Sequence, residues 1–238
     1  MTAILSCRNL VKSFASEPPL IVLDHLSADF HENEICAITG MSGKGKSTLL
    51  AILGGTAKPD TGTVDFMGKQ ITSLPANELD SIHRCGIGFI TQDPFLFQAL
   101  TARENLLFAA KMQPNFSPSS VDIALEEFGL LDRADHLPCE LSVGQKRRLV
   151  IARALFGGGH SVILADEPTN DLDSHWSSIV FEKLESFAHN KGHAVIAVTH
   201  DEPFATKCDV EYELDSGVLL RRRQHGNAQK IRSINNPT

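Results

Sequence analysis

The chain has 238 residues, of which 42% are hydrophobic and 21% are charged, and its formal net charge is −7. This length suffices for a large buried core, and the composition is ordinary for a globular domain. The negative balance disfavours broad electrostatic binding to DNA or RNA, so we expect no nucleic-acid partner. The basic run at residues 221–223 is interpreted as a solvated tail in preference to a contact for lipid headgroups or a partner.

The 5 cysteines are scattered and form no C-x-x-C pair. This argues against a disulfide framework or a zinc site and fits a reducing cytosol. The N-terminal "MTAILSCRNLVKSF" lacks a long apolar stretch, so no signal peptide is expected. No segment reaches the roughly 20 apolar residues that cross a bilayer; "LVIARALFGGG" comes closest, and Arg148 and Arg153 interrupt it. Any membrane-spanning part is therefore expected on another chain.

The first part of the chain shows strand patterns. "LSADF" at residues 26–30 alternates apolar and polar side chains, as a half-buried strand does. "ICAITG" at 35–40 and "GIGFITQ" at 86–92 are short apolar runs, typical of strands buried in a parallel sheet.

From residue 101 the pattern becomes helical. "TARENLLFAAKM" and "SSVDIALEEFGLL" repeat apolar residues every three or four positions, which predicts two helices, the second capped by Ser119 or Ser120. The β-branched runs "SVILADE" (161–167) and "AVIAVTH" (194–200) enclose a segment predicted to be a helix closed by Gly192. A hairpin with its turn at residues 215–217 is expected in "VEYELDSGVLL". Alternating strands and helices predict a parallel sheet with ligands at the carboxyl ends of its strands.

A phosphate-loop motif follows the strand at 35–40. Residues 40–48 read "GMSGKGKST" and fit G-x-x-x-x-G-K-[ST], placed before the helical "TLLAILGG". Such a loop turns backbone N–H groups toward phosphate oxygens at a helix N-terminus. We expect Lys46 to reach the β- and γ-phosphates of ATP, Ser47 to bind Mg²⁺, and Lys44 to point to solvent. The nucleotide-binding residues predicted in the loop are Gly40, Ser42, Gly43, Gly45, Lys46, Ser47 and Thr48.

Two acids end the apolar run "VILADE". Asp166 is expected to hold the Mg²⁺ shell directly or through water. Glu167 is expected to polarise the attacking water as a general base.

These residues, in order with "LSVGQ", "NDLD" and "VTHD", resemble the ATP-binding-cassette ATPases over nearly the whole chain. The resemblance implies an α/β fold: a P-loop NTPase core with a parallel sheet, an antiparallel β-layer and a helical subdomain. It implies a single domain over residues 1–238, with the helical subdomain at about residues 93–157.

The same resemblance implies roles for side chains outside the phosphate loop. Gln92 would sense Mg²⁺ and the attacking water, on a loop facing a transmembrane partner, and His200 would contact the γ-phosphate. Together with Lys46 and Glu167 they form the expected catalytic set. Phe14 would stack on adenine, and residues 170–173 would cross to a second subunit. Each residue also has a simpler interpretation. Gln92 could be an ordinary strand-end amide, His200 a structural histidine and Phe14 a core residue of the β-layer. Residues 170–173 could form a solvated turn in which Asp173 caps a helix.

The stretch "LSVGQ" begins a basic helical run, "KRRLVIARAL". In the family this segment caps the ATP held by the other subunit, so the resemblance implies a homodimer. Ser142 and the amide of Gly144, with Gln145 beside them, would bind that ATP at a helix N-terminus. Val143 stands where the family usually has glycine. It is tolerable if the position is an ordinary helix start and strained if φ is positive.

"LLAILGG", "LTARENL" and "VILADEPTNDLD" resemble the branch that serves lipoprotein release, macrolide and peptide efflux, and haem efflux. That implies a separate integral-membrane permease, export, and a peripheral place on the cytoplasmic face of the membrane. The short segment after His200 tells against importer cassettes with appended domains. Two alternatives remain: a soluble cassette of the iron–sulfur-assembly type, and a non-hydrolysing module in which nucleotide regulates assembly.

Overall fold

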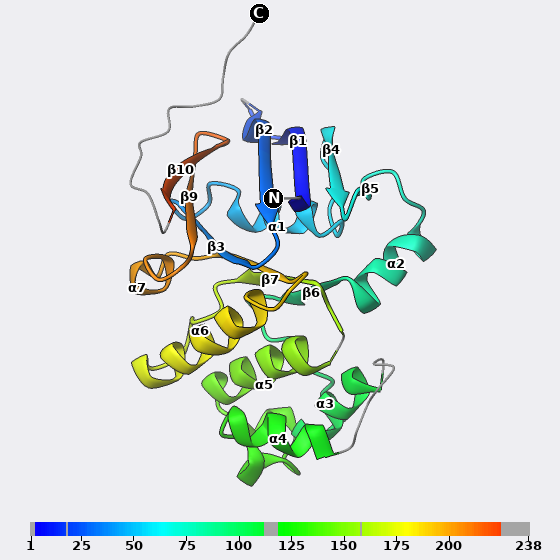
Figure 1. Ribbon diagram of the computed structural model, residues 1–238, viewed down its shortest axis with the longest axis vertical. Helices are drawn as coiled ribbons and strands as arrows, with labels where there is room; N and C mark the ends of the chain where they lie inside the picture. Colours follow the sequence, from blue (N-terminus) through cyan, green and yellow to red (C-terminus); the bar gives the residue numbers. More distant parts are fainter. Residues whose placement is uncertain (1–2, 18, 112–118, 158, 225–238) are drawn as a thin grey trace, which may run out of the picture.

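Two β-sheets and a group of helices stack as layers in the computed structural model (Figure 1), which describes residues 3–17, 19–111, 119–157 and 159–224. The strands are β1 (Ala3–Phe14), β2 (Leu20–His31), β3 (Glu34–Thr39), β4 (Thr61–Phe66), β5 (Lys69–Gln70), β6 (Ile87–Ile90), β7 (Val162–Asp166), β8 (Ala194–Val198), β9 (Val210–Asp215) and β10 (Val218–Gln224). The α-helices are α1 (Lys46–Leu53), α2 (Ala76–Cys85), α3 (Ala102–Ala110), α4 (Ser119–Glu127), α5 (Val143–Phe156), α6 (Ser174–Ala188) and α7 (Glu202–Ala205), and the 3-10 helices are η1 (Leu131–Arg133) and η2 (Pro138–Glu140).

The larger sheet has six strands in the order β10-β9-β3-β8-β7-β6. The five strands from β9 to β6 are parallel, and β10 pairs antiparallel with β9. The smaller sheet, β2-β1-β4-β5, is antiparallel throughout. The predicted fold class, an α/β phosphate-loop core with an antiparallel β-layer, is therefore confirmed.

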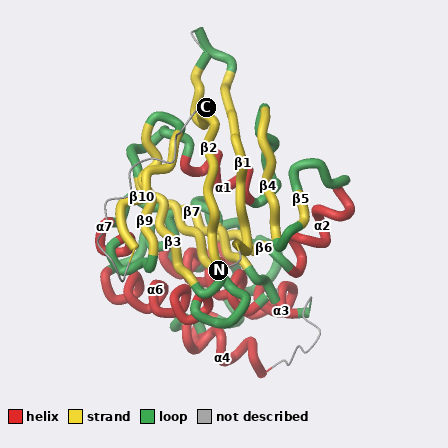
Figure 2. Tube along the Cα trace, turned by 45° about the horizontal axis from the view of Figure 1, so that its top comes forward, coloured by secondary structure: helices red, strands yellow, loops and turns green. Residues whose placement is uncertain are grey.

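The parallel strands are buried on both faces. In β3, Ile35 and Ala37 belong to the core that faces the helices, whereas Cys36 and Ile38 belong to the core shared with α1 and the antiparallel sheet. β7 and β8 alternate in the same way. Figure 2 shows the helices α3 to α6 gathered below the strands. A strand packed on both sides needs apolar residues at every position, which explains the uninterrupted runs in the sequence.

Most of the predicted elements are present, with three differences. The helix expected to close at Gly192 ends at Ala188, and Gly192 lies in the following turn with φ of 79°. Ser119 and Ser120, the predicted caps of the second helix, both lie inside it, since α4 begins at Ser119. The basic run at 221–223 is part of β10, not a tail; Arg221 lies over the Tyr212 ring and Arg222 forms an ion pair with Glu213.

The predicted hairpin turn is formed by Ser216 and Gly217, with φ of 49° and 81°. Positive φ at both central residues gives a turn whose twist matches the flanking strands. A Cβ on Gly217 would lie 2.8 Å from the amide nitrogen of Asp24, so this turn also brings β9 and β10 against β2.

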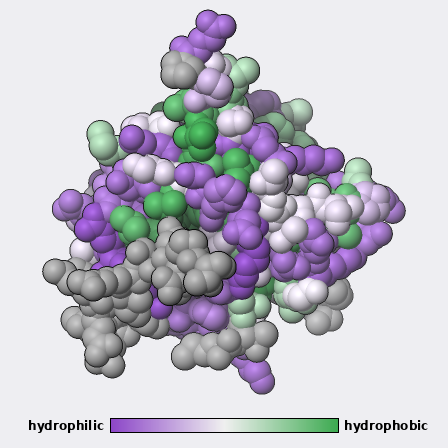
Figure 3. All heavy atoms as spheres, turned by 90° about the horizontal axis from the view of Figure 1, so that it is seen from above, coloured by the Kyte–Doolittle hydropathy of each residue, from purple (hydrophilic) through white to green (hydrophobic). Residues whose placement is uncertain are grey.

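On the face seen from above, hydrophilic residues surround small groups of hydrophobic ones (Figure 3). None of the helices in the described ranges combines the length and apolarity that crossing a membrane requires.

Asn105 organises the segment between β6 and α3. Its side chain is fully buried. Its Oδ1 accepts from the Phe97 amide at 2.9 Å, and its Nδ2 donates to the carbonyls of Phe97, Leu100 and Thr101 at 3.1, 2.9 and 3.0 Å. Two of these groups, the Phe97 amide and the Leu100 carbonyl, have no backbone partner in the described part of the chain, whereas the carbonyls of Phe97 and Thr101 also accept from the amides of Leu100 and Asn105.

Replacing Asn105 by Leu keeps the approximate size but leaves the Phe97 amide and the Leu100 carbonyl without a partner. We expect the free energy of unfolding to fall by about 2–4 kcal/mol, since two orphaned groups contribute. Urea denaturation followed by circular dichroism measures it. Asn77→Leu, at an exposed site on α2, is the control and should shift stability by less than about 0.5 kcal/mol. Equal losses in both variants would contradict the role given to Asn105.

Candidate functional site

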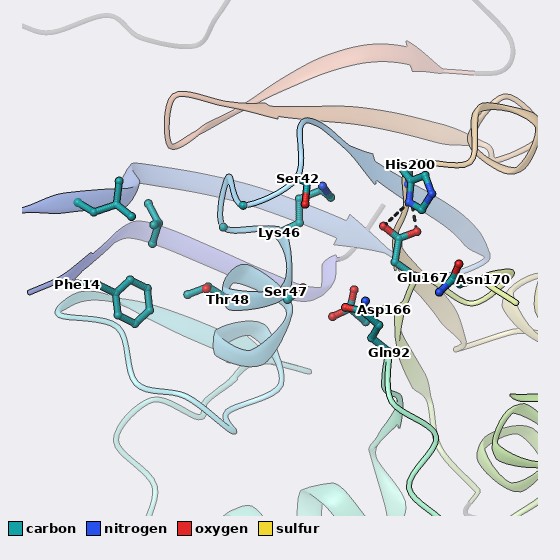
Figure 4. Close-up of a pocket in the computed structure, with 14 residues that line it drawn as sticks. Phe14, Ser42, Lys46, Ser47, Thr48, Gln92, Asp166, Glu167, Asn170 and His200 are labelled. Carbon is teal, nitrogen blue, oxygen red and sulfur yellow. Dashed lines mark hydrogen bonds and ion pairs between the residues drawn. The ribbon is translucent and has the colours of Figure 1, made fainter. Parts of the chain in front are cut away.

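A cavity of about 370 Å³ opens at the carboxyl ends of the parallel strands (Figure 4). Phe14 stands at one end, Glu167 and His200 stand at the other, and Lys46, Ser47 and Thr48 lie between them. The walls come from the antiparallel sheet, the loop before α1, and the loops after β6, β7 and β8. The lining residues are Phe14, Leu20, Val22, Ser42, Gly43, Gly45, Lys46, Ser47, Thr48, Gln92, Asp166, Glu167, Asn170 and His200.

The loop from Gly40 to Gly45 leads into α1, with Gly45 as the N-cap at φ of 96°. A Cβ at Gly45 would lie 3.0 Å from the carbonyl oxygen of Val22, so both the conformation and the packing require glycine. The ammonium of Lys46 donates to the carbonyls of Gly40 and Met41 at 2.7 and 3.1 Å. Because an ammonium has three donors, one remains for an anion at the start of the helix.

Asp166 ends β7 and accepts a hydrogen bond from the Ser47 hydroxyl. Burial raises the pKa of Asp166, while Ser47, Lys46 and Arg147 act in the opposite direction. A partly desolvated carboxylate beside a hydroxyl is a suitable oxygen pair for Mg²⁺, which prefers one or two carboxylates together with phosphate oxygens and water. Over the described ranges no group of three His, Cys, Asp or Glu side chains is placed to hold a metal ion by itself.

Glu167 and His200 come from adjacent strand ends and contact each other. The Nδ1 of His200 lies 2.9 Å from Oε1 of Glu167, and the His200 amide donates to Oε2 at 3.2 Å. Glu167 has φ of 50°, and its amide donates to the Val198 carbonyl at 2.9 Å. A non-glycine residue in the left-handed region is strained; here the bond to β8 holds it, and the carboxylate is directed into the cavity.

The loops after β7 and β8 are joined by a contact that the sequence did not reveal. The Thr169 hydroxyl is buried and donates to Oδ2 of Asp201 at 2.8 Å, while Oδ1 of Asp201 accepts from the Phe204 amide at 3.2 Å and caps α7. Thr169 and Asp201 therefore fix the two loops that carry Glu167 and His200.

Gln92 and Phe14 also line the cavity, whereas Gly40 is not among its lining residues. Gln92 is exposed just beyond the end of β6. Phe14 is 46% exposed, which makes the interpretation as a core residue wrong. Leu20 and Val22 form the same apolar end; sequence reasoning missed them because β2 resembles any half-buried strand.

The "LSVGQ" stretch does not line this cavity. Ser142 is the N-cap of α5, accepting from the Gln145 amide at 3.2 Å while the Gln145 side chain accepts from the Ser142 amide at 2.8 Å. Val143 is the first residue of α5 and so has ordinary helical backbone angles; valine is tolerated there, and its side chain is exposed. Asp173 is indeed the N-cap of α6.

The profile described as "ABC transporter" matches residues 23–170. The chain belongs to the ABC transporter family. It is the ATP-hydrolysing module of that family, as the phosphate loop and the acids beside it had indicated.

Curated relatives of this ABC ATPase include the macrolide export ATP-binding/permease protein MacB of Salmonella choleraesuis (strain SC-B67), which is 39% identical over 225 residues covering 92% of the chain. The protein of the same name from Escherichia coli (strain K12) is 38% identical over 225 residues covering 93% of the chain. In both cases the match covers 34% of the relative, so the chain spans about a third of the length of these proteins.

Among solved structures, the ABC ATPase resembles the cassette MJ0796 in a dimeric post-hydrolysis state bound to ADP and Pi. The TM-score is 0.86 and the identity 31%, with 94% of this chain and 100% of that chain covered. A second dimeric structure of MJ0796 has a TM-score of 0.84 at 32% identity, with 92% of this chain and 98% of that chain covered. ATP binding by the chain is supported by the family and by this nucleotide-bound neighbour.

Replacing Lys46 by Ala should weaken ATP binding and lower kcat about 100-fold or more, because it removes the one buried ammonium of the phosphate loop. Binding of a fluorescent ATP analogue and release of phosphate measure the two effects. Lys44→Ala is the matched control, since Lys44 is exposed and lies outside the cavity lining; it should change either value by no more than about twofold. Normal turnover by the Lys46 variant would contradict the phosphate-loop assignment.

Proposed function

We propose that this chain is the ATP-hydrolysing subunit of an exporter, working head-to-tail as a dimer around two ATP molecules beside a separate integral-membrane permease. The observation that carries this is the 39% identity to a macrolide export protein across 92% of the chain. The proposal places the subunit on the cytoplasmic face of the membrane, where it would extrude a lipoprotein, a peptide, an antibiotic or haem.

The proposed ATP position follows the cavity from end to end. Adenine stacks on Phe14, against the apolar wall of Leu20 and Val22, since an aromatic face accepts a base without polar pairing. The phosphates follow the loop toward α1, where backbone N–H groups and Lys46 meet them. The γ-phosphate then lies on the side of Glu167 and His200.

In the proposed hydrolysis, a water oxygen attacks the γ-phosphorus, the bond to the β–γ bridging oxygen breaks, and ADP leaves with that electron pair. Glu167 accepts the proton of the water. His200 holds the Glu167 carboxylate through the two contacts described above and faces the transferred phosphoryl group, while Gln92 orients the water. Ser47 and Asp166, with Gln92, would hold Mg²⁺, which supplies charge neutralisation for the phosphate oxygens.

The dimer is proposed because the "LSVGQ" stretch lies outside its own cavity. The N-terminus of α5 offers backbone N–H groups and a favourable dipole to an anion, so Ser142, Gly144 and Gln145 of one copy would complete the cavity of the other. The loop at residues 170–173, against which Gly144 packs, would cross beside it. The dimeric state reported for MJ0796 supports this arrangement.

The Glu167→Gln variant should bind ATP normally and lose turnover about 100-fold or more, because the amide cannot accept the proton. ATP and Mg²⁺ should then hold it as a dimer, measured by light scattering after size-exclusion chromatography. Glu202→Gln, an exposed change in α7 outside the cavity lining, is the control. It should hydrolyse ATP at the wild-type rate and return to the oligomeric state that it had before ATP was added. Hydrolysis at the wild-type rate by Glu167→Gln would contradict the general-base assignment.

The export proposal is tested by identifying the membrane protein that copurifies with the chain. Tagged Glu167→Gln protein, loaded with ATP and Mg²⁺ in gently solubilised native membranes, should retain a permease with few transmembrane helices and a large external domain, identified by mass spectrometry. Lys46→Ala protein, deficient in nucleotide, should retain it less. Recovery of a soluble assembly partner, or of no partner at all, would overturn the export proposal and leave the ATPase assignment standing.

A further inference from the structure

Arg147 is a buried charge at the start of α5. It belongs to the basic run that follows "LSVGQ", where a solvated side chain would be ordinary, yet it is only 1% exposed. Burying a guanidinium is costly unless its donors are paired. The partners of Arg147 therefore indicate what this charge does.

One guanidinium joins three segments. Nη1 donates to the Thr91 carbonyl at 2.7 Å and Nη2 donates to the Gln92 carbonyl. Nη2 also lies 4.0 Å from Oδ2 of Asp171. The start of α5, the segment leaving β6 and the loop after β7 thus meet at a single side chain.

The charge of Arg147 persists in this setting. Burial lowers the pKa of Arg147, whereas the nearby carboxylates of Asp171, Asp166, Asp93 and Glu167 raise it, and a guanidinium does not lose its proton in proteins. Arg147 also partly offsets the burial that raises the pKa of Asp166.

We propose that Arg147 is a positioning residue for ATP hydrolysis, which fixes the segment bearing Gln92 to the start of α5 and to the loop of Asp171. This rests on the proposed function, in which Gln92 orients the attacking water. Arg147 touches only backbone carbonyls of that segment, so the Gln92 side chain stays free to face the cavity. The planar guanidinium fork of Arg147 donates to two successive carbonyls and so fixes the direction of the backbone at residues 91–92. The ammonium of a lysine cannot make this paired contact.

The neighbouring Arg148 provides a contrast. It is also buried, at 8% exposure, but donates to the carbonyls of Phe128 and Gly129 and stacks over Trp176 at 3.8 Å from the ring centroid. Arg148 therefore joins the end of α4 to α6 and makes no recorded contact with the cavity residues. A comparison of variants at the two arginines therefore separates the effect of losing a buried guanidinium from the effect of losing the contact with the Gln92 carbonyl.

The experiment compares Arg147→Met with Arg148→Met in the full chain. For Arg147→Met we expect kcat to fall about tenfold or more while the dissociation constant for ATP changes less than about threefold. Hydrogen exchange of the peptide covering residues 91–95 should accelerate. Both variants should lower the thermal unfolding temperature to a similar extent, since each loses a buried guanidinium. Arg148→Met should nevertheless leave kcat and the exchange of residues 91–95 within about twofold of the wild type. Equal effects of the two variants on kcat and exchange would overturn the proposal.

A double variant that combines Arg147→Met with Gln92→Ala tests the positioning role of Arg147 separately from the proposed role of Gln92 in hydrolysis. If Arg147 acts through Gln92, the double variant should lose no more than about twofold beyond Gln92→Ala alone. Independent, multiplying losses would overturn the positioning role. If Gln92→Ala leaves kcat unchanged, the proposed role of Gln92 fails, while the exchange measurement still decides whether Arg147 holds the segment.

Two milder variants cover the case in which Arg147→Met does not fold. Arg147→Lys keeps the charge without the fork and should retain less than about a third of the wild-type kcat. Asp171→Asn removes only the more distant charge and should fall between Arg147→Lys and the wild type. Wild-type kcat and exchange in Arg147→Lys would show that the fork does not matter and would overturn the proposal.

Discussion

The site depends on one constraint: parallel strands end at the same edge of their sheet. In register, Ile38 pairs with Val198, and Val198 pairs with Asp166. The loop after β3, the acids that end β7 and the histidine that follows β8 therefore emerge at one level, although they lie far apart in the sequence. No long loop has to carry a functional side chain to its place. The cavity follows from the pairing of β3, β8 and β7, and the antiparallel sheet needs only to close its apolar end.

The same constraint explains which parts of the fold were predictable. β3, β7 and β8 are packed on both faces, so their sequences are continuous apolar runs, and the polar residues directly after them mark the edge. β4, β5 and α2 were not predicted; α2 buries no residue fully, and only Leu79 and Ile82 pack partly against the core, so its apolar face is too short to stand out as a helical run. The end of α6 was misplaced because Gly192, a typical helix terminator, serves the next turn instead, and the left-handed backbone of Glu167 leaves no mark in the sequence.

The basic run of α5 shows a different limit. Lys146, Arg147 and Arg148 are indistinguishable in sequence from a solvated helix face. Arg147 and Arg148 are buried because backbone carbonyls of distant segments, at the ends of β6 and α4, lie against them. Every residue has a backbone carbonyl, so the residue types in a sequence do not indicate where such hydrogen-bond partners lie. Val143 is the opposite case: the departure from the family pattern was visible, and only the helix boundary showed that it carries no backbone strain.

The two ends of the cavity belong to different sheets: Phe14 and Leu20 come from the antiparallel layer, whereas the acids come from the parallel one. A molecule that fills the cavity thus contacts both layers, which also meet through side-chain packing and through the bond from the Asp24 amide to the Gly217 carbonyl at 2.9 Å. Any ligand that binds only the folded chain adds to its stability, by about 2.7 kcal/mol at a hundred times its dissociation constant. Because such a ligand contacts both layers at once, it binds less well where the layers have moved apart. We therefore expect the two layers to resist relative displacement more strongly with nucleotide bound than without it.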